Sequence, residues 1–141
     1  MAITGENAPI ISSDIGLLGA SLKKVNLRNN RIGGTIPNSI KSLIFLTTFD
    51  VSYNNLQGGL PDILLTKATG LEVLRVGHNS LTGTIPDLPL FQLRELNLSF
   101  NNFNGTLPDL SLSQLKDINL SFNNFTGNVA NVFFDVPNLG K

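Results

Sequence analysis

The sequence contains no cysteine and no tryptophan, and only 14% of its 141 residues are charged. Without cysteine, neither a disulfide framework nor thiolate chemistry can contribute to folding or function. Ten Lys and Arg residues balance ten Asp and Glu residues, so no net field would draw the chain to nucleic acid or to an anionic membrane. We therefore expect no nucleic-acid partner.

Long apolar runs are missing as well. No stretch approaches the roughly 20 apolar residues that a membrane-spanning helix requires, so we expect no membrane insertion by this segment. The first residues, MAITGENAPI, lack the basic and apolar regions of a signal peptide. The residues alone therefore leave a cytoplasmic location open.

Leucine, asparagine and glycine are abundant instead, and they recur at a regular spacing. Five segments follow the pattern L-x-x-apolar-x-apolar-x-x-N-x-apolar-x-G, with first leucines 24, 25, 22 and 22 residues apart. The segments are LKKVNLRNNRIGG, LTTFDVSYNNLQG, LEVLRVGHNSLTG, LRELNLSFNNFNG and LKDINLSFNNFTG, starting at Leu22, Leu46, Leu71, Leu93 and Leu115. Such a period predicts a solenoid in which each repeat adds one layer.

Each position of the repeat has a physical role. The alternation of apolar and polar residues, as in Val25-x-Leu27, predicts a short strand with one buried face, and stacked strands would form a parallel sheet. The asparagine that recurs in each segment is expected to be a buried amide that pairs with backbone groups at the turn. The glycine that follows permits a tight bend. These residues are Asn30, Asn54, Asn79, Asn101 and Asn123, and Gly34, Gly58, Gly83, Gly105 and Gly127.

A proline step after the glycine carries a resemblance to a known family. The segments T-I-P, G-L-P, T-I-P and T-L-P end at Pro37, Pro61, Pro86 and Pro108. The full pattern over residues 22–130 resembles the plant-type leucine-rich repeat of receptor-like kinases, receptor-like proteins and polygalacturonase-inhibiting proteins. The resemblance implies an α/β fold, a right-handed horseshoe solenoid with a parallel β-sheet on the concave face and little helix. It also implies a second strand or bend on one flank and a helical turn on the convex side.

The convex side is expected to differ between repeats. Ile40, Leu43 and Leu46 keep an apolar convex pattern. The segments after Pro86 and Pro108 are shorter, so we expect extended chain there.

The two ends depart from the pattern. Residues 1–21 are expected to be a partial repeat or N-terminal cap, with Ile15, Leu17, Leu18 and Leu22 as the apolar positions of a preceding repeat. Residues 131–141 are expected to cap the last layer through an apolar cluster at 132–136. The cysteine-paired W-x-G-V-x-C cap of the plant family is missing, which favours either a fragment of a longer solenoid or a non-secreted lineage. Uncapped solenoid ends would be able to associate.

Exposed positions of the strand face are expected to carry binding specificity. Residues 22–45 hold five basic residues and no acid. This surface would either bind an anionic group of a ligand, such as a carboxylate or sulfate, or be an ordinary run of solvated charges. A column of rings just before the ladder asparagines either contacts a partner or packs on itself. The candidate binding residues are Lys24, Arg28, Asp50, Tyr53, Arg75, His78, Phe100 and Phe122.

Catalysis is not indicated. Glu95 and Asp117 occupy one column of adjacent predicted strands about 5 Å apart, a separation found in retaining glycosidases. Cationic neighbours and an open surface favour neutralised surface charges instead. His78 has no His or Cys companion for a metal, and no phosphate-binding loop occurs, so we expect no enzyme, metal or cofactor.

Four N-x-S/T sequons mark candidate glycosylation sites at Asn97, Asn104, Asn119 and Asn124. Asn97 and Asn119 are predicted on the strand face, where a glycan would obstruct binding. The number of sequons is close to chance for a chain with eighteen asparagines.

The predicted function is a ligand or protein recognition module that resembles a plant receptor-like ectodomain. The resemblance implies peptide, steroid or co-receptor partners and an extracellular or cell-surface location. One alternative is a free-standing inhibitor of cell-wall hydrolases. Another is a structural or ice-binding scaffold, suggested by the threonine line at 35, 84 and 106 and the exposed asparagines at 26, 97 and 119.

Overall fold

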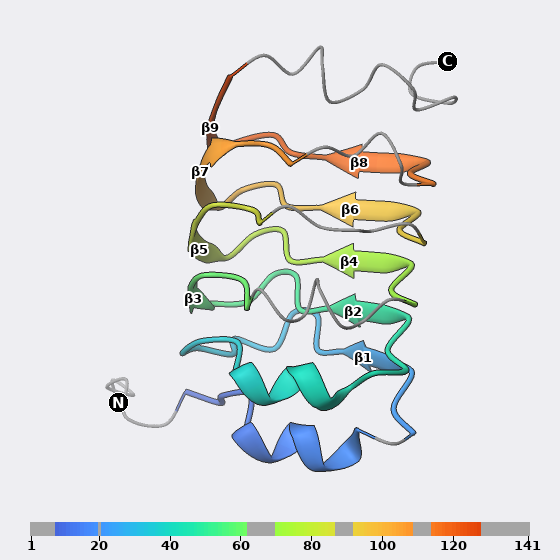
Figure 1. Cartoon of the computed structure of the whole chain (residues 1–141). Coiled ribbons are helices and arrows are strands. Elements are labelled where there is room, and N and C mark those ends of the chain that lie inside the picture. Colours follow the sequence, from blue (N-terminus) through green and yellow to red (C-terminus); the bar gives the residue numbers. More distant parts are fainter. Residues whose placement is uncertain (1–7, 20, 62–69, 87–91, 109–113, 128–141) are drawn as a thin grey trace, which may run out of the picture.

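The computed structural model describes residues 8–19, 21–61, 70–86, 92–108 and 114–127, which form a stack of similar layers (Figure 1). One side of the stack is a five-stranded parallel sheet in the order β1-β2-β4-β6-β8. Its strands are Lys24–Asn26, Thr48–Asp50, Val73–Arg75, Glu95–Asn97 and Asp117–Asn119. The prediction of a parallel sheet with one strand per repeat is confirmed.

The register of this sheet aligns equivalent residues of every repeat. The central residue of each strand points inward, and Val25, Phe49 and Leu74 are at most 6% exposed. The repeat leucines, such as Leu46 and Leu93, are fully buried beside them. Because each layer presents the same apolar set, the core continues from layer to layer without a break.

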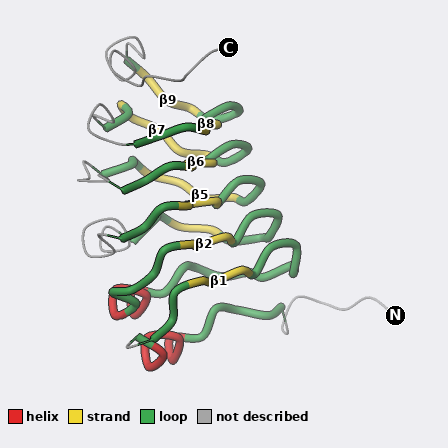
Figure 2. The backbone as a smooth tube through the Cα atoms, turned by 90° about the vertical axis from the view of Figure 1, so that its right-hand side faces the viewer, coloured by secondary structure: helices red, strands yellow, loops and turns green. Residues whose placement is uncertain are grey.

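A second, smaller parallel sheet lies on the opposite flank, as Figures 1 and 2 show. Its strands are β3 (Gln57–Gly58), β5 (Ser80–Gly83), β7 (Asn102–Thr106) and β9 (Asn124–Thr126). Gly58 has a φ of +79°, and a Cβ there would stand 3.1 Å from the methyl group of Thr35. The bend therefore needs glycine for both its conformation and its space.

The asparagines form a ladder between the layers. In Asn54, the Oδ1 atom accepts from the backbone N–H groups of Asn30 and Ile32 at 3.0 and 2.9 Å. Its Nδ2 group donates to the carbonyls of Leu27 and Val51 at 2.9 and 2.8 Å. Equivalent bonds recur at Asn79, Asn101 and Asn123.

The first asparagine of the ladder differs from the others. We expected Asn30 to be buried, and this prediction is wrong: its side chain is exposed and its Nδ2 donates to the carbonyl of Arg28. Buried ladder residues reach backward to the N–H groups of the preceding repeat's turn. The Asn30 amide instead bonds to a carbonyl two residues earlier, within its own turn.

Two short 3₁₀ helices stack at the N-terminal end, η1 (Ser13–Leu18) and η2 (Asn38–Ser42) (Figure 1). Ile10 forms a parallel bridge to Gly33, which extends the flank sheet by one position. Ile40 and Leu43 are buried, so the predicted convex pattern holds in that repeat. The described residues 8–19 therefore contact the first repeat through η1 and the Ile10 bridge.

The apolar positions assigned within that tail were partly wrong. Leu17 and Leu18 are 85% and 55% exposed, whereas Ile11 is 6% exposed. A 3₁₀ helix has three residues per turn, so Gly16 and Gly19 lie on one edge, and this edge packs on η2. A Cβ at Gly16 would be 2.8 Å from the carbonyl oxygen of Ser39. The two leucines consequently project away from η2.

The extended segments predicted after Pro86 and Pro108 and the cap predicted over residues 131–141 fall largely or wholly outside the described residues. Within the part that the structure describes, no helix combines the length and apolarity needed to cross a membrane.

Candidate functional site

The outward positions of the large sheet form one continuous face. The first residues of the five strands form one column of this face, in which each residue is in register with the next. They are Lys24, Thr48, Val73, Glu95 and Asp117. Lys24 and Asp117 are exposed and the three residues between them are half-buried. The predicted binding face is therefore accessible from one end of the described sheet to the other.

The predicted ring column lies along the edge of this face. Tyr53, His78, Phe100 and Phe122 stack with ring centroids 4.2 Å apart and planes 12–18° from parallel. The expectation that the rings would pack on one another is confirmed, and they also remain accessible. Tyr53, Phe100 and Phe122 are 44%, 41% and 70% exposed.

The backbone at the ring column was not predicted. All four ring residues have a left-handed φ between 53° and 57°. Asn29, at the same position of the first repeat, has a φ of 59°. Asparagine tolerates this conformation better than bulky residues do. The asparagine in that repeat was the signal that sequence reasoning missed.

A cation covers the first ring of the column. The guanidinium carbon of Arg28 lies 4.7 Å from the centroid of the Tyr53 ring, a cation–π arrangement. Arg28, Lys23, Lys24 and Arg31 are all exposed. Among the described residues, the ion pairs within 4.0 Å all involve Arg75, and none of them includes a cation of the first repeat.

Asp50 was predicted at the exposed face, and this prediction is wrong because the residue is 2% exposed. Its Oδ1 accepts from the backbone N–H and the hydroxyl of Ser52 at 3.0 and 2.6 Å. Its Oδ2 pairs with Arg75 Nη1 at 3.4 Å. Asn97 and Asn119, at the same repeat position, accept from the serine two residues later in the same way. The bonds of Asp50 to Ser52 therefore close a turn that also occurs in other repeats.

Arg75 is occupied by two carboxylates. Besides Asp50, it donates through Nε and Nη2 to both carboxylate oxygens of Glu95, the latter at 2.6 Å. The hydrogen bonds with Glu95 raise the pKa of Arg75 further above its ordinary value, and Asp50 adds to the effect. The predicted use of Arg75 to orient an anionic ligand is therefore not supported by this geometry. Exposed cations lie in the first repeat, at Lys23, Lys24 and Arg28, and also at Arg94 and Lys116 of the last two repeats.

Glu95 and Asp117 are in register on β6 and β8, as predicted. They line a shallow concavity of about 410 Å³ together with Leu96, Asn97, Ile118 and Asn119. Glu95 forms an ion pair with Arg75, whereas Asp117 is exposed. In the described parts of the chain, no three His, Cys, Asp or Glu residues gather in a way that would hold a metal ion.

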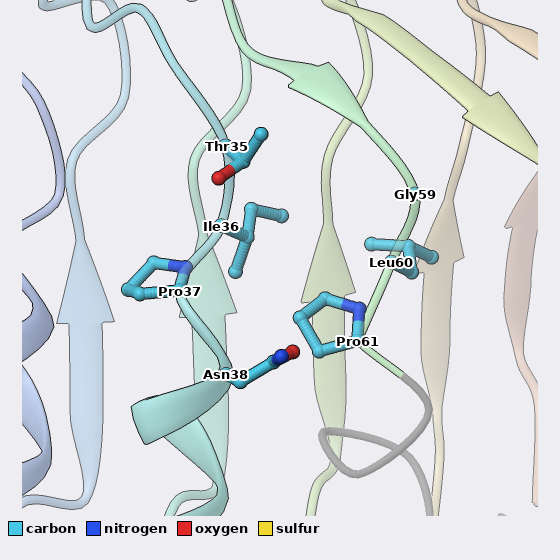
Figure 3. Close-up of a pocket in the computed structure, with 7 residues that line it drawn as sticks. All are labelled: Thr35, Ile36, Pro37, Asn38, Gly59, Leu60 and Pro61. Carbon is cyan, nitrogen blue, oxygen red and sulfur yellow. The ribbon is translucent and has the colours of Figure 1, made fainter.

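A second hollow, of about 370 Å³, lies on the flank between the first two repeats (Figure 3). Thr35, Ile36, Pro37 and Asn38 line one side, and Gly59, Leu60 and Pro61 line the other. Gly59 occupies the position that threonine has in neighbouring repeats. The threonine line at 35, 84 and 106 is thus interrupted, which weakens the alternative of a regular ice-binding array.

The four candidate glycosylation sites fall on two different surfaces. Asn97 and Asn119 lie in β6 and β8, and their Oδ1 atoms are bonded to Ser99 and Ser121. Asn104 and Asn124 are exposed on β7 and β9 of the flank sheet. Modification of any of them stays a prediction.

Comparison with known proteins identifies the repeat. The family model described as Leucine Rich Repeat matches residues 21–43, 45–66, 70–90, 92–112 and 114–135. Each match begins one residue before the leucine that opens the repeat. A comparison with curated protein sequences found no match.

Several solved structures of plant receptors share the fold. The ectodomain of the Arabidopsis thaliana receptor kinase GASSHO1/SCHENGEN3, in complex with CASPARIAN STRIP INTEGRITY FACTOR 2, is 35% identical with a TM-score of 0.83, over 89% of this chain and 15% of that one. The structure of the Arabidopsis receptor kinase HAESA in complex with the peptide hormone IDA and the co-receptor SERK1 is also similar. It is 32% identical with a TM-score of 0.79, over 85% of this chain and 20% of that one. A chain of the BIR3–SERK2 complex from Arabidopsis thaliana is 32% identical with a TM-score of 0.73, over 86% of this chain and 65% of that one.

The chain thus spans less than two thirds of the length of these receptors. Its repeats, its parallel sheet and its similarity to plant receptor-kinase ectodomains agree with one another. The chain belongs to the leucine-rich repeat family, in its plant type.

Proposed function

We propose that the face of the large sheet is a recognition surface for a peptide or protein partner that carries an anionic group. We further propose that the protein acts outside the cell or at its surface. Similar ectodomains occur in complexes with a peptide hormone and with co-receptors, which supports a recognition role of this class.

The observation that carries the proposal is the placement of Arg28. Its guanidinium is held against the Tyr53 ring and has no carboxylate within 4.0 Å among the described residues. A guanidinium with its N–H groups free is suited to bind a planar carboxylate or a sulfate. Lys23 and Lys24, exposed in the same repeat, add to the positive potential there.

A rigid platform would favour such binding. The side chains of this face project from a hydrogen-bonded sheet, so little ordering entropy is lost when a partner docks. The rings of Tyr53 and Phe100 supply accessible apolar area beside the cation. We expect replacement of either ring by alanine to weaken binding by about 1–3 kcal/mol.

The test is affinity capture from extracellular fluid of the source tissue, with the native chain and an Arg28→Gln/Tyr53→Ala variant as parallel baits. A specific partner should be retained by the native chain and lost from the variant. The matched variants Lys24→Gln and Lys41→Gln then distinguish the strand face from the side that carries the 3₁₀ helices. Both lysines are exposed, but Lys24 lies in β1 and Lys41 lies in η2. If Lys41→Gln weakens binding of that partner and Lys24→Gln does not, the strand face is not the recognition surface.

A further inference from the structure

The turn that leads from η2 into β2 exposes two large apolar side chains. Ile44 and Phe45 are 51% and 52% exposed, although Leu43 and Leu46 on either side of them are buried. The repeat does not require an apolar residue at this point. The residue before the repeat leucine is polar or glycine in the other four repeats, namely Ser21, Gly70, Gln92 and Gln114. The ring of Phe45 is therefore an exception that the fold does not need.

Leu18 extends this apolar surface on the layer below. Gly19 packs closely against the carbonyl oxygen of Ser42, and that oxygen accepts the backbone N–H of Ile44 at 2.9 Å. The end of η1 therefore adjoins the turn, as the stacking of η1 on η2 also indicates (Figure 1). Leu18 comes directly before Gly19 and is 55% exposed. Leu18, Ile44 and Phe45 together are called the corner patch.

Lysines lie on both sides of the corner patch. Lys41 is in η2, just before the turn. The carbonyl of Lys23 accepts the N–H of Thr47, two residues after Phe45, at 2.8 Å. Both lysines are exposed, and the sequence contains no acidic residue between positions 15 and 49. The zero net charge of the chain thus conceals a corner that is both basic and apolar.

This combination of side chains suits the surface of an anionic membrane. Apolar side chains that protrude from a turn can enter the boundary between headgroups and acyl chains, while long lysine side chains keep their ammonium groups among the headgroups. Each cation also gains from the negative potential of such a surface. A second copy of the chain suits the patch less well, because a two-fold symmetric contact would bring the lysines of both copies together.

We propose that the corner patch is a peripheral contact site for anionic lipid. The side chains of Leu18, Ile44 and Phe45 enter the interface, and Lys23 and Lys41 bind headgroup phosphates. Such a contact needs no membrane-spanning helix. It uses no residue of the large sheet, so the inference does not depend on the recognition surface proposed above.

Sedimentation with lipid vesicles tests the contact. The anionic probe is a vesicle of phosphatidylserine and phosphatidylcholine in equal amounts, and phosphatidylcholine alone is the reference. We expect the native chain to sediment with the mixed vesicles only, and to do so less at high salt, which screens exposed charges. The double variant Ile44→Thr/Phe45→Gln should bind about tenfold or more weakly. Its melting temperature should not fall, because Thr69 and Gln92 occupy these positions in the sequence of other repeats.

Matched replacements elsewhere separate the corner patch from the rest of the surface. Phe122→Gln removes an equivalent ring that is 70% exposed in the last repeat, and it should leave vesicle binding unchanged. Lys23→Gln/Lys41→Gln should weaken binding several-fold. Arg94→Gln/Lys116→Gln makes the same change of charge at exposed positions and should have little effect. Equal losses for the two charge variants would mean that net charge alone drives binding, which would overturn the proposed site.

A fluorescent reporter shows which part of the chain enters the lipid. The sequence has no tryptophan, so Phe45→Trp and Phe122→Trp each introduce a single one. We expect the emission of Phe45→Trp to move to shorter wavelength on addition of mixed vesicles and to be quenched by brominated lipid. The emission of Phe122→Trp should not change.

Three results would overturn the lipid contact. The first is an equal response of the two reporters, and the second is a native chain that sediments with neither kind of vesicle. The third is a dimer that forms without lipid and is lost in Ile44→Thr/Phe45→Gln, because the corner patch would then be a contact between copies of the chain.

Discussion

The methyl group of Thr35 lies over Gly58 of the next repeat, where a Cβ would be 3.1 Å away from it. The same contact recurs between Thr84 and Gly105 and between Thr106 and Gly127. Gly83 has no such neighbour within 4 Å of its Cβ direction, because the preceding repeat has Gly59 in the threonine position. One contact of the series is therefore missing between the second and third repeats.

Gly59→Thr should restore this contact. A Cβ at Gly59 meets nothing closer than 3.7 Å, and its backbone is not in the left-handed region. We expect the substitution to stabilise the fold by about 0.5–1 kcal/mol, from a less flexible unfolded chain and a buried methyl group. Urea denaturation measures the change. Gly58→Ala is the control and should destabilise by more than about 1 kcal/mol, because its φ is +79°. A destabilised Gly59→Thr would contradict this view of the flank.

The asparagine ladder predicts a sharp contrast between neighbours. Asn101 is 8% exposed and bonds to Leu81 of the preceding repeat as well as to its own turn. Asn101→Ala should leave these backbone groups unpaired and cost about 1–3 kcal/mol. Replacement of the exposed Asn102 by alanine should lower the free energy of unfolding by about a few tenths of a kcal/mol at most. Equal melting temperatures for the two variants would show that the ladder bonds do not stabilise the solenoid.

Replacement of Arg75 should destabilise the fold more than replacement of its buried partner Asp50. Arg75→Gln leaves Asp50 as an unpaired charge at 2% exposure, for which we expect about 1–3 kcal/mol of destabilisation. Asp50→Asn should cost less, because Asn97 makes the same bonds to its serine. The double variant should recover part of the loss of Arg75→Gln. Additive effects in a double-mutant cycle would rule out a coupled pair.

The stacking of η1 on η2 depends on a close approach at glycine. Gly16→Ala would place a Cβ 2.8 Å from the Ser39 carbonyl oxygen, so we expect about 1–3 kcal/mol of destabilisation from overpacking. Leu17→Ala, at an 85% exposed position of the same helix, should change stability by about 0.5 kcal/mol at most. Thermal unfolding of both variants checks the assignment. A larger loss for Leu17→Ala would mean that the leucine, rather than the glycine edge, holds the helix in place.

The repeat pattern predicted the strands, the ladder and the flank bends, because each of these depends on one residue type at one repeated position. Asp50 was misplaced since its burial depends on a pairing with Arg75 that no single repeat contains. Leu17 and Leu18 were misplaced because their exposure follows from three-residue turns and two glycines rather than from hydropathy. The left-handed backbone at Tyr53 was overlooked because aromatic residues rarely adopt it.

The ladder also bears on how such a chain can gain or lose repeats. Each buried ladder asparagine binds backbone groups of its own and the preceding repeat. Every repeat supplies these groups regardless of its side chains, so the ladder bonds do not require a particular order of most layers. The Asp50–Arg75–Glu95 network is different because it joins three particular layers through side chains. Excision of the third repeat would remove Arg75 and bring the second and fourth repeats together. The buried carboxylate of Asp50 would then lack its cationic partner. The middle of this solenoid is consequently fixed in order, whereas the fifth repeat has no such constraint among the described contacts.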